Sequence, residues 1–188
     1  MHRPAPDDVL LGLLKAQPAH GYELLEYFRD REHLGRIWNM STSQLYAVLK
    51  RLEEEGAVTG REVLQPDAPS RTEYALTDLG EQRLSAWLSD PHPPTSIHRI
   101  RVMFLSRLYI ATLLSLPTEG IIARQLAVCE EQRKHMLEES RQTSSSVEAL
   151  TLTFVTGQLE AAIAWLHYCQ TNPLTIPTNL IPSKVETG

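Results

Sequence analysis

The side chains best suited to recognition chemistry lie between residues 41 and 50. The stretch opens with the hydroxyls of Ser41, Thr42 and Ser43, continues with Gln44, and contains no acidic residue. A glutamine can form two hydrogen bonds with adenine, and serine or threonine can bind a base or a phosphate. If these residues begin a helix, its free backbone N–H groups would also attract phosphate. The stretch therefore predicts a helix whose N-terminal half can enter the major groove of double-stranded DNA.

Residue patterns typical of enzymes and metal sites are missing from the sequence. The seven histidines show no paired ligand spacing, and there is no His-Glu-x-x-His, Cys-x-x-Cys or glycine-rich phosphate loop. The run Ser144–Ser146 is typical of a loop and helix cap. Cys129 and Cys169 lie in apolar helical patterns, which predicts buried free thiols. We therefore expect no enzyme activity, no metal and no cofactor.

The elements that must position the polar stretch fall into two halves. In the first half, apolar spacing predicts helices over 8–16, 20–33, from the caps Ser41 and Thr42 to residue 55, and over 78–89. Strands over 58–64 and 71–76 flank a turn-rich loop. In the second half, we expect helices over 96–115, 118–141 and 146–171. The intervening prolines 91, 93 and 94 interrupt helical patterning and predict a short, stiff connector.

These elements predict a mostly α fold with two domains. Residues 1–90 form a winged helix-turn-helix DNA-binding domain, and residues 91–95 are a linker. Residues 96–171 form a three-helix dimerisation domain, and residues 172–188 are a flexible tail. The order of three helices followed by a two-stranded hairpin places the third helix in the major groove of DNA.

The net charge of −5 weighs against a strongly DNA-binding surface. Residues 1–90 hold ten Lys or Arg against fifteen Asp or Glu, whereas residues 91–188 hold eight of each. DNA binding depends on the charges that face phosphate, so this balance weakens the prediction without excluding it. No apolar run approaches the roughly 18 residues of a membrane span, and the N-terminus lacks a signal pattern. We therefore expect a cytoplasmic protein with no membrane partner.

The first half of the sequence resembles the PadR family, specifically its longer-tailed members. The motifs that carry the resemblance are Leu10–Leu14, Pro18–Leu24, Trp38, Ser43–Tyr46, Leu49–Gly56 and Glu73–Gly80. The resemblance is dense over residues 9–89 and looser to about residue 170. It implies a homodimeric repressor whose C-terminal helices pack against those of its partner. It also implies an operator with two-fold symmetry and, in some members, release of DNA by a small, often aromatic, effector.

The resemblance also implies which residues lie near DNA. The matching positions are Tyr22, Thr42, Ser43, Gln44 and Tyr46, and the third helix and the wing add the cations Lys50, Arg61 and Arg71. Other roles stay open: Tyr22 could pack in the core, and Lys50 and Arg71 could be solvated surface charges. The wing departs from the basic wing of the family, because its tip carries Asp67 and two prolines.

Two further predictions concern the second half. The helices over 96–115 and 146–170 carry more apolar residues than one buried stripe needs, which predicts an obligate homodimer with an interface of about 2,000 Å². An effector would bind at the domain junction, near aromatic residues that could equally fill the core: Trp87, Phe104, Tyr109 and Trp165. The alternative function is a winged-helix protein-interaction module that does not bind DNA.

Overall fold

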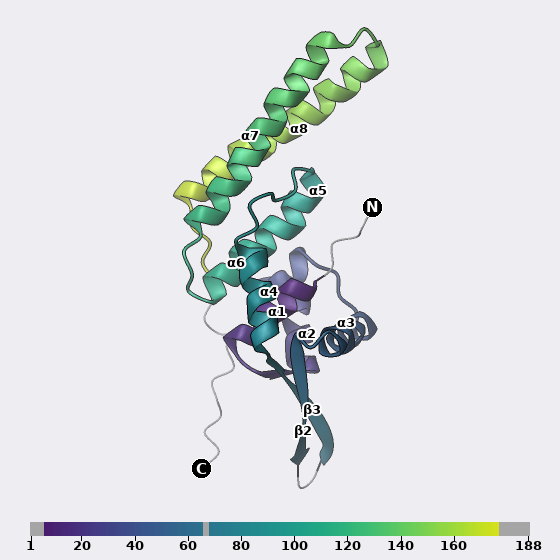
Figure 1. Cartoon of the computed structure of the whole chain (residues 1–188), viewed down its shortest axis with the longest axis vertical. Coiled ribbons are helices and arrows are strands. Elements are labelled where there is room, and N and C mark those ends of the chain that lie inside the picture. The colour runs from purple at the N-terminus through teal and green to yellow at the C-terminus, as the bar shows by residue number, and fades with distance from the viewer. Residues whose placement is uncertain (1–5, 66–67, 177–188) are drawn as a thin grey trace.

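The computed structural model describes residues 6–65 and 68–176, and the termini beyond them lie outside the described residues. Figure 1 shows a winged part at one end and a long two-helix arm at the other. The winged part contains α1 (Asp7–Ala16), β1 (Ala19–His20), α2 (Gly21–Arg29), a 3₁₀ turn (Leu34–Arg36), α3 (Thr42–Glu54), β2 (Val58–Gln65), β3 (Ala68–Leu76) and α4 (Asp78–Leu88). The predicted mostly helical winged fold is confirmed.

The winged part differs from the sequence expectation in two details. A two-residue strand, β1, pairs antiparallel with β3 through Ala19 and Tyr74, so the sheet has the order β1-β3-β2. The second helix ends at Arg29 rather than near residue 33. It ends there because Asp30 has an extended backbone and its carbonyl accepts hydrogen bonds from the N–H groups of His33 and Gly35.

The second half begins with one continuous helical run rather than a uniform α-helix. Its parts are α5 (Ile97–Arg99), a π-helical segment (Ile100–Phe104) and α6 (Leu105–Leu113). After the loop at residues 114–118, α7 (Glu119–Gln142) and α8 (Ser146–Thr171) form the antiparallel hairpin that projects from the body as the arm (Figure 1). Ser145 caps α8 by accepting a hydrogen bond from the Glu148 N–H, as its sequence position predicts.

The run from Ile97 to Leu113 joins two hydrophobic cores. Tyr109 and Ile110 pack in the core of the winged part, and Ile110 lies so close to Gly12 of α1 that a Cβ there would overlap it. Phe104 and Leu108 pack instead with α7 and α8. Both apolar faces of this run are therefore buried within one chain, so its apolar excess gives no ground for a dimer. Of the two helices whose surplus apolar residues predict a dimer, only α8 still supports that prediction.

Buried polar side chains of α6 and α7 hold the end of α4 and the proline connector in place. Arg107 donates to the carbonyl of Trp87 at 3.0 Å and forms an ion pair with Asp90 at 2.6 Å. The side chain of Gln125 donates to the carbonyl of Pro94 at 3.0 Å. Because these bonds cross from the second half to the end of α4 and the connector, they resist hinge motion between the two halves.

Helix α8 is distinctive in composition. Among the described residues it is the one helix long and apolar enough to cross a membrane, and 28% of its most apolar window is buried. A helix that packs in a protein core or against another chain has the same composition, so this property by itself assigns no membrane location. Val147, Leu150, Phe154 and Tyr168 of α8 are exposed in the single chain.

Candidate nucleic-acid interface

The start of α3 is fixed by a reciprocal cap. Ser41 Oγ accepts a hydrogen bond from the Gln44 backbone N–H at 3.2 Å, and Gln44 Oε1 accepts one from the Ser41 backbone N–H at 2.9 Å. In the free protein, the glutamine predicted to read a base therefore helps to cap the N-terminus of its own helix. Its Nε2 group and the second lone pair of Oε1 remain available for a base edge.

One face of α3 is buried and the opposite face is free. Leu45, Val48, Leu49 and Leu52 pack in the core, whereas the exposed residues include the predicted contacts Thr42, Ser43, Gln44, Tyr46 and Lys50. The first turn holds no acidic residue. The ammonium group of Lys50 lies 3.8 Å from the Glu54 carboxylate, one turn further along. The cation therefore lies between the carboxylate-free helix start and the acidic helix end.

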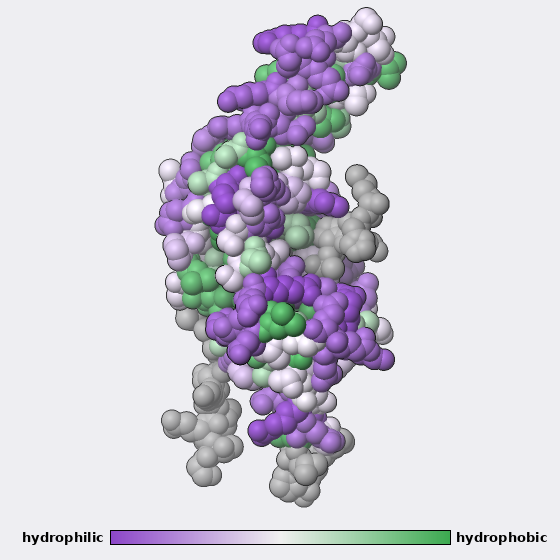
Figure 2. Space-filling model, viewed as in Figure 1, coloured by the Kyte–Doolittle hydropathy of each residue, from purple (hydrophilic) through white to green (hydrophobic). Residues whose placement is uncertain are grey.

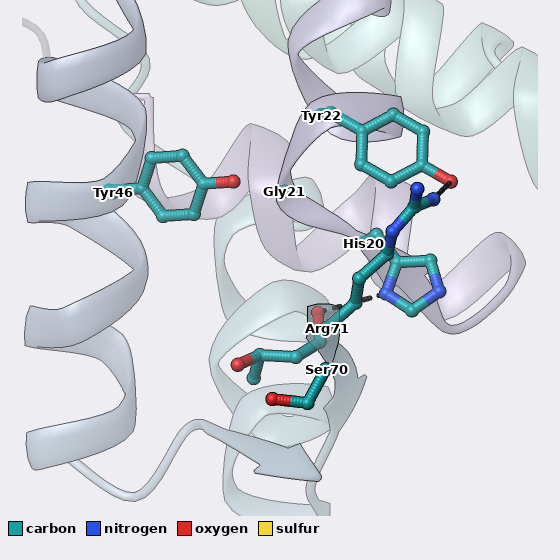
Figure 3. A pocket seen from close by; sticks show the side chains of 7 residues that line it. His20, Gly21, Tyr22, Tyr46, Ser70 and Arg71 are labelled. Atoms are coloured by element: carbon teal, nitrogen blue, oxygen red, sulfur yellow. Dashed lines mark hydrogen bonds between the residues drawn. The ribbon is translucent and has the colours of Figure 1, made fainter. Parts of the chain in front are cut away.

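Three of the predicted contacts meet around a cavity that we call the tyrosine groove. Its volume is about 510 Å³, and it is lined by His20, Gly21, Tyr22, Tyr46, Ser70, Arg71 and Thr72 (Figure 3). It brings together the N-terminus of α2, the exposed side of α3 and the wing strand β3. Such a groove offers backbone N–H groups, hydroxyls and one guanidinium, which are the donors that bind phosphate.

The side chains of the tyrosine groove hold one another in place. Arg71 Nη1 donates to Tyr22 Oη at 3.2 Å, and the guanidinium lies 5.3 Å from the centre of the Tyr22 ring. The His20 ring stacks on the Tyr22 ring, and the two ring centroids lie 5.6 Å apart. A Cβ on Gly21 would lie 2.7 Å from the Tyr46 ring, so only glycine lets that ring approach α2. Sequence reasoning missed His20 and Gly21, although both lie in the motif Pro18–Leu24.

The wing offers less positive charge than α3. Arg61 on β2 is directly opposite Glu73 on β3, while Arg71 is opposite Val63. The tip residues Pro66 and Asp67, on which the predicted weakness of the wing partly depends, lie outside the described residues. Of the two predicted wing cations, Arg71 therefore has the better-defined position for binding a phosphate.

The four aromatic residues predicted to bind an effector are divided between the two cores. Trp87 and Tyr109 belong to the winged core, where Trp87 lies under Arg107 and the Tyr109 hydroxyl lies 2.6 Å from His33 Nδ1. Phe104 and Trp165 belong to the arm core and contact each other edge to face at 5.5 Å. Burial raises the pKa of the Tyr109 hydroxyl, which therefore stays protonated. The effector assignment stays a prediction.

A different cavity, which we call the arginine groove, lies between α3 and the π-helical segment. It has a volume of about 660 Å³, and its lining includes Arg36, Trp38, Arg51, His98 and Arg101 but no carboxylate. Gln44 also contributes to this lining. A molecule bound there would contact both halves of the chain and the start of α3.

No cluster of three or more metal-binding side chains occurs in the part of the chain that the structure describes. Both cysteines are free thiols, Cys129 buried and Cys169 half-buried. Burial raises the pKa of each thiol, which keeps both protonated and unreactive near neutral pH.

The helix order, the β hairpin and the exposed third helix define a winged helix-turn-helix protein. Residues 10–86 match the model of the Transcriptional regulator PadR-like family. The chain is 36% identical over 108 residues to the negative transcriptional regulator PadR of Bacillus subtilis, covering 56% of each protein. It is 34% identical over 90 residues to the probable transcriptional regulator Rv1176c of Mycobacterium tuberculosis, covering 48% of this chain and 46% of that one. The matched region thus spans about half of each relative.

Solved structures of PadR-like proteins also resemble the chain, with loose overall superposition. Bacillus subtilis PadR in complex with operator DNA has a TM-score of 0.45 at 26% identity, covering 88% of this chain and 95% of that chain. The PadR-like regulator BC1756 from Bacillus cereus has a TM-score of 0.42 at 20% identity, covering 92% and 98%. The similarity to the family rests on the sequence matches.

Proposed function

We propose that this chain is a cytoplasmic transcriptional repressor that binds double-stranded DNA as a homodimer and has no enzyme activity. Residues 1–90 bind an operator with two-fold symmetry, and residues 96–171 dimerise. The observation that carries the proposal is the tyrosine groove beside the carboxylate-free start of α3. There Tyr22, Tyr46 and Arg71 surround one cavity, next to the exposed residues Thr42 and Ser43.

The proposed contacts divide into two kinds. Ser43 and Gln44 read base edges from the N-terminal half of α3, because these residues reach furthest into a groove that a helix enters N-terminus first. Tyr22, Tyr46, Lys50 and Arg71 bind phosphate and set the orientation of the domain. Gln44 can read a base either with its free Nε2 donor or by releasing the Ser41 N–H.

The distribution of carboxylates supports DNA binding by an acidic domain. Arg83 contacts Asp7, Asp8 and Glu55 at 3.2, 2.9 and 2.7 Å, and Arg51 also pairs with Asp7. Burial raises the pKa of Asp8, although Arg83 opposes this effect. These carboxylates lie around α1, α4 and the far end of α3 and are partly neutralised. Their charge therefore opposes phosphate binding at the start of α3 less than the net charge suggests.

The test is binding to the DNA upstream of the chain's own gene, measured by fluorescence anisotropy at several salt concentrations. Gln44→Ala should relax preference at one position of each half-site, at a cost of about 1–3 kcal/mol. Lys50→Ala should weaken binding to all sequences alike and reduce the salt slope by about one. Lys134→Ala, an exposed lysine of α7, is the control and should change neither. A wild-type dimer that binds no DNA would favour the protein-interaction module.

We further propose regulation by a small aromatic acid at the domain junction. The predicted aromatic residues Trp87, Phe104, Tyr109 and Trp165 lie near this junction, but the arginine groove has the better chemistry for a carboxylate. There an acid could stack on Trp38 and pair with Arg36 or Arg101. Binding should quench tryptophan fluorescence and weaken operator binding together, because coupling between two sites is reciprocal. Arg101→Ala should abolish both effects, and quenching with unchanged operator affinity would argue against regulation.

A further inference from the structure

Helix α8 carries two heptad stripes of apolar or small residues. The inner stripe packs along α7 and consists of Leu152, Thr156, Leu159, Ile163 and Leu166, all buried. The second, which we call the outer seam, is exposed and consists of Val147, Leu150, Phe154, Gly157, Ala161, Ala164, Tyr168 and Thr171. Both stripes alternate steps of three and four residues, which is the spacing of helices that pack along one another.

The outer seam has no partner within the described part of the chain. At about 3.6 residues per turn, it lies on the side of α8 roughly opposite the inner stripe. Val147, Leu150, Phe154 and Tyr168 are 73%, 72%, 66% and 61% exposed. A Cβ built on Gly157 meets no atom within 4 Å. In Figure 2, hydrophilic side chains dominate the arm where α7 faces the viewer, and green side chains appear at its edge.

We propose that the outer seam binds the same seam of a second copy, with the two α8 helices antiparallel and crossing at Gly157 and Ala161. The inference rests on the homodimer of the proposed function and adds its contact face and its register. The occupant is a second copy because the seam is complementary to itself when one helix is reversed.

The complementarity follows from the order of residue sizes along the seam. When Gly157 is placed against Ala161 of the second copy, Phe154 faces Ala164 and Leu150 faces Tyr168. Val147 then faces Thr171, so every position of the seam has a partner. Each phenylalanine meets a small residue, and the smallest residues meet at the centre, where two helices approach most closely.

Other arrangements match less well. A parallel pair would place Phe154 against Phe154 and Gly157 against Gly157. Pairs of large side chains would then alternate with pairs of small residues along the seam. An antiparallel pair shifted by one heptad would leave Tyr168 and Thr171 unpaired in one direction, or Val147 and Leu150 in the other. Charge does not prevent the proposed register, because the seam itself carries no charged residue. Glu160 lies as near the centre as Gln158 but on the opposite flank, so the two Glu160 carboxylates approach each other at the exposed edge of the pair, where water and salt screen their repulsion.

The first test uses a substitution that the single chain should accept. Gly157→Leu places a good helix former where nothing lies within 4 Å, so the helix content of the folded chain should not fall. At a close crossing the leucine would hold the helices apart, so the dimer dissociation constant should rise at least tenfold in sedimentation equilibrium. Thr153→Leu, exposed on the polar flank of α8, is the control and should leave the constant unchanged. An unchanged constant for Gly157→Leu would overturn the seam.

The second test determines direction and register by cross-linking in a Cys169→Ser background. Gln158 lies beside the centre and should come close to Gln158 of the second copy, so Gln158→Cys should give a disulfide-linked dimer on mild oxidation. Thr151 lies on the same flank, one heptad away, and Thr151→Cys should stay monomeric on a denaturing gel. Cross-linking at Thr151, or at neither position, would overturn the register.

Failure of the seam and failure of the proposed DNA binding can be told apart. Cross-linking at Gln158 without DNA binding would support the seam and refute the repressor. Operator binding together with an unchanged dimer dissociation constant for Gly157→Leu would support the repressor and refute the seam. The chain should also remain unbound in flotation with vesicles of phosphatidylcholine and phosphatidylglycerol. Flotation of the wild-type chain with these vesicles would show that the outer seam meets lipid and would overturn the proposal.

Discussion

Removing one buried hydroxyl should measure how firmly the two halves of the chain are joined. Tyr109 Oη on α6 lies 2.6 Å from Nδ1 of His33, which follows α2, and both side chains are buried. Nε2 of His33 has no hydrogen-bond partner among the described residues. Tyr109→Phe therefore leaves the buried imidazole without a partner. Such an unsatisfied group costs about 1–3 kcal/mol, which for a chain of this size lowers the thermal midpoint by roughly 2–10 °C.

The assay is urea unfolding followed by circular dichroism at pH 7.5, with Tyr46→Phe as the control for losing an exposed tyrosine hydroxyl. The control should change the free energy of unfolding by less than about 0.5 kcal/mol. In a double-mutant cycle with His33→Phe, the coupling energy between the two residues should be about 0.5–3 kcal/mol. A Tyr109→Phe variant as stable as the control would refute the reasoning.

The same pair predicts a pH dependence of stability. Burial lowers the pKa of His33 below its ordinary value of 6.5, and the nearby Asp30 and Glu32 oppose this shift only in part. The unfolded chain therefore binds more protons than the folded chain between the two pKa values, and stability rises with pH in that range. The contribution of His33 is complete above about pH 6.5 and is lost as the pH falls below it. His33→Phe should flatten the pH dependence in this range, and an unchanged slope would contradict the assignment.

Two further predictions concern stability within the body. Arg107→Met removes a buried guanidinium that binds the Trp87 carbonyl and Asp90, and should lower the free energy of unfolding by about 2–4 kcal/mol, since Asp90 keeps partial access to water. Arg141→Met breaks an exposed pair and should cost less than about 0.5 kcal/mol in the same urea titration. Gly80→Ala should destabilise by roughly 1–3 kcal/mol, although alanine favours helix, because its Cβ would overlap the backbone carbonyl of Ala57. A higher urea midpoint for Gly80→Ala would disprove that packing argument.

The sequence by itself determined the class of fold and the helix expected to meet DNA. Apolar spacing located the long helices, and hydroxyl caps fixed where α3 and α8 begin, because a side chain three residues away satisfies a free N–H locally. Most of the candidate interface was also predictable, since Thr42, Ser43, Gln44, Tyr46 and Lys50 follow one another on a single helix.

Only the tertiary structure decided how distant residues combine. The tyrosine groove joins α2, α3 and β3, and the strand β1 exists only because β3 supplies its partner. Spacing showed that two helices of the second half had surplus apolar residues, but it could not show which surplus another part of the chain would cover. The run from Ile97 to Leu113 buries its surplus against α1, whereas α8 leaves its outer seam exposed. Burial depends on what packs against a residue from elsewhere in the chain, and one-dimensional periodicity records only which face would be covered.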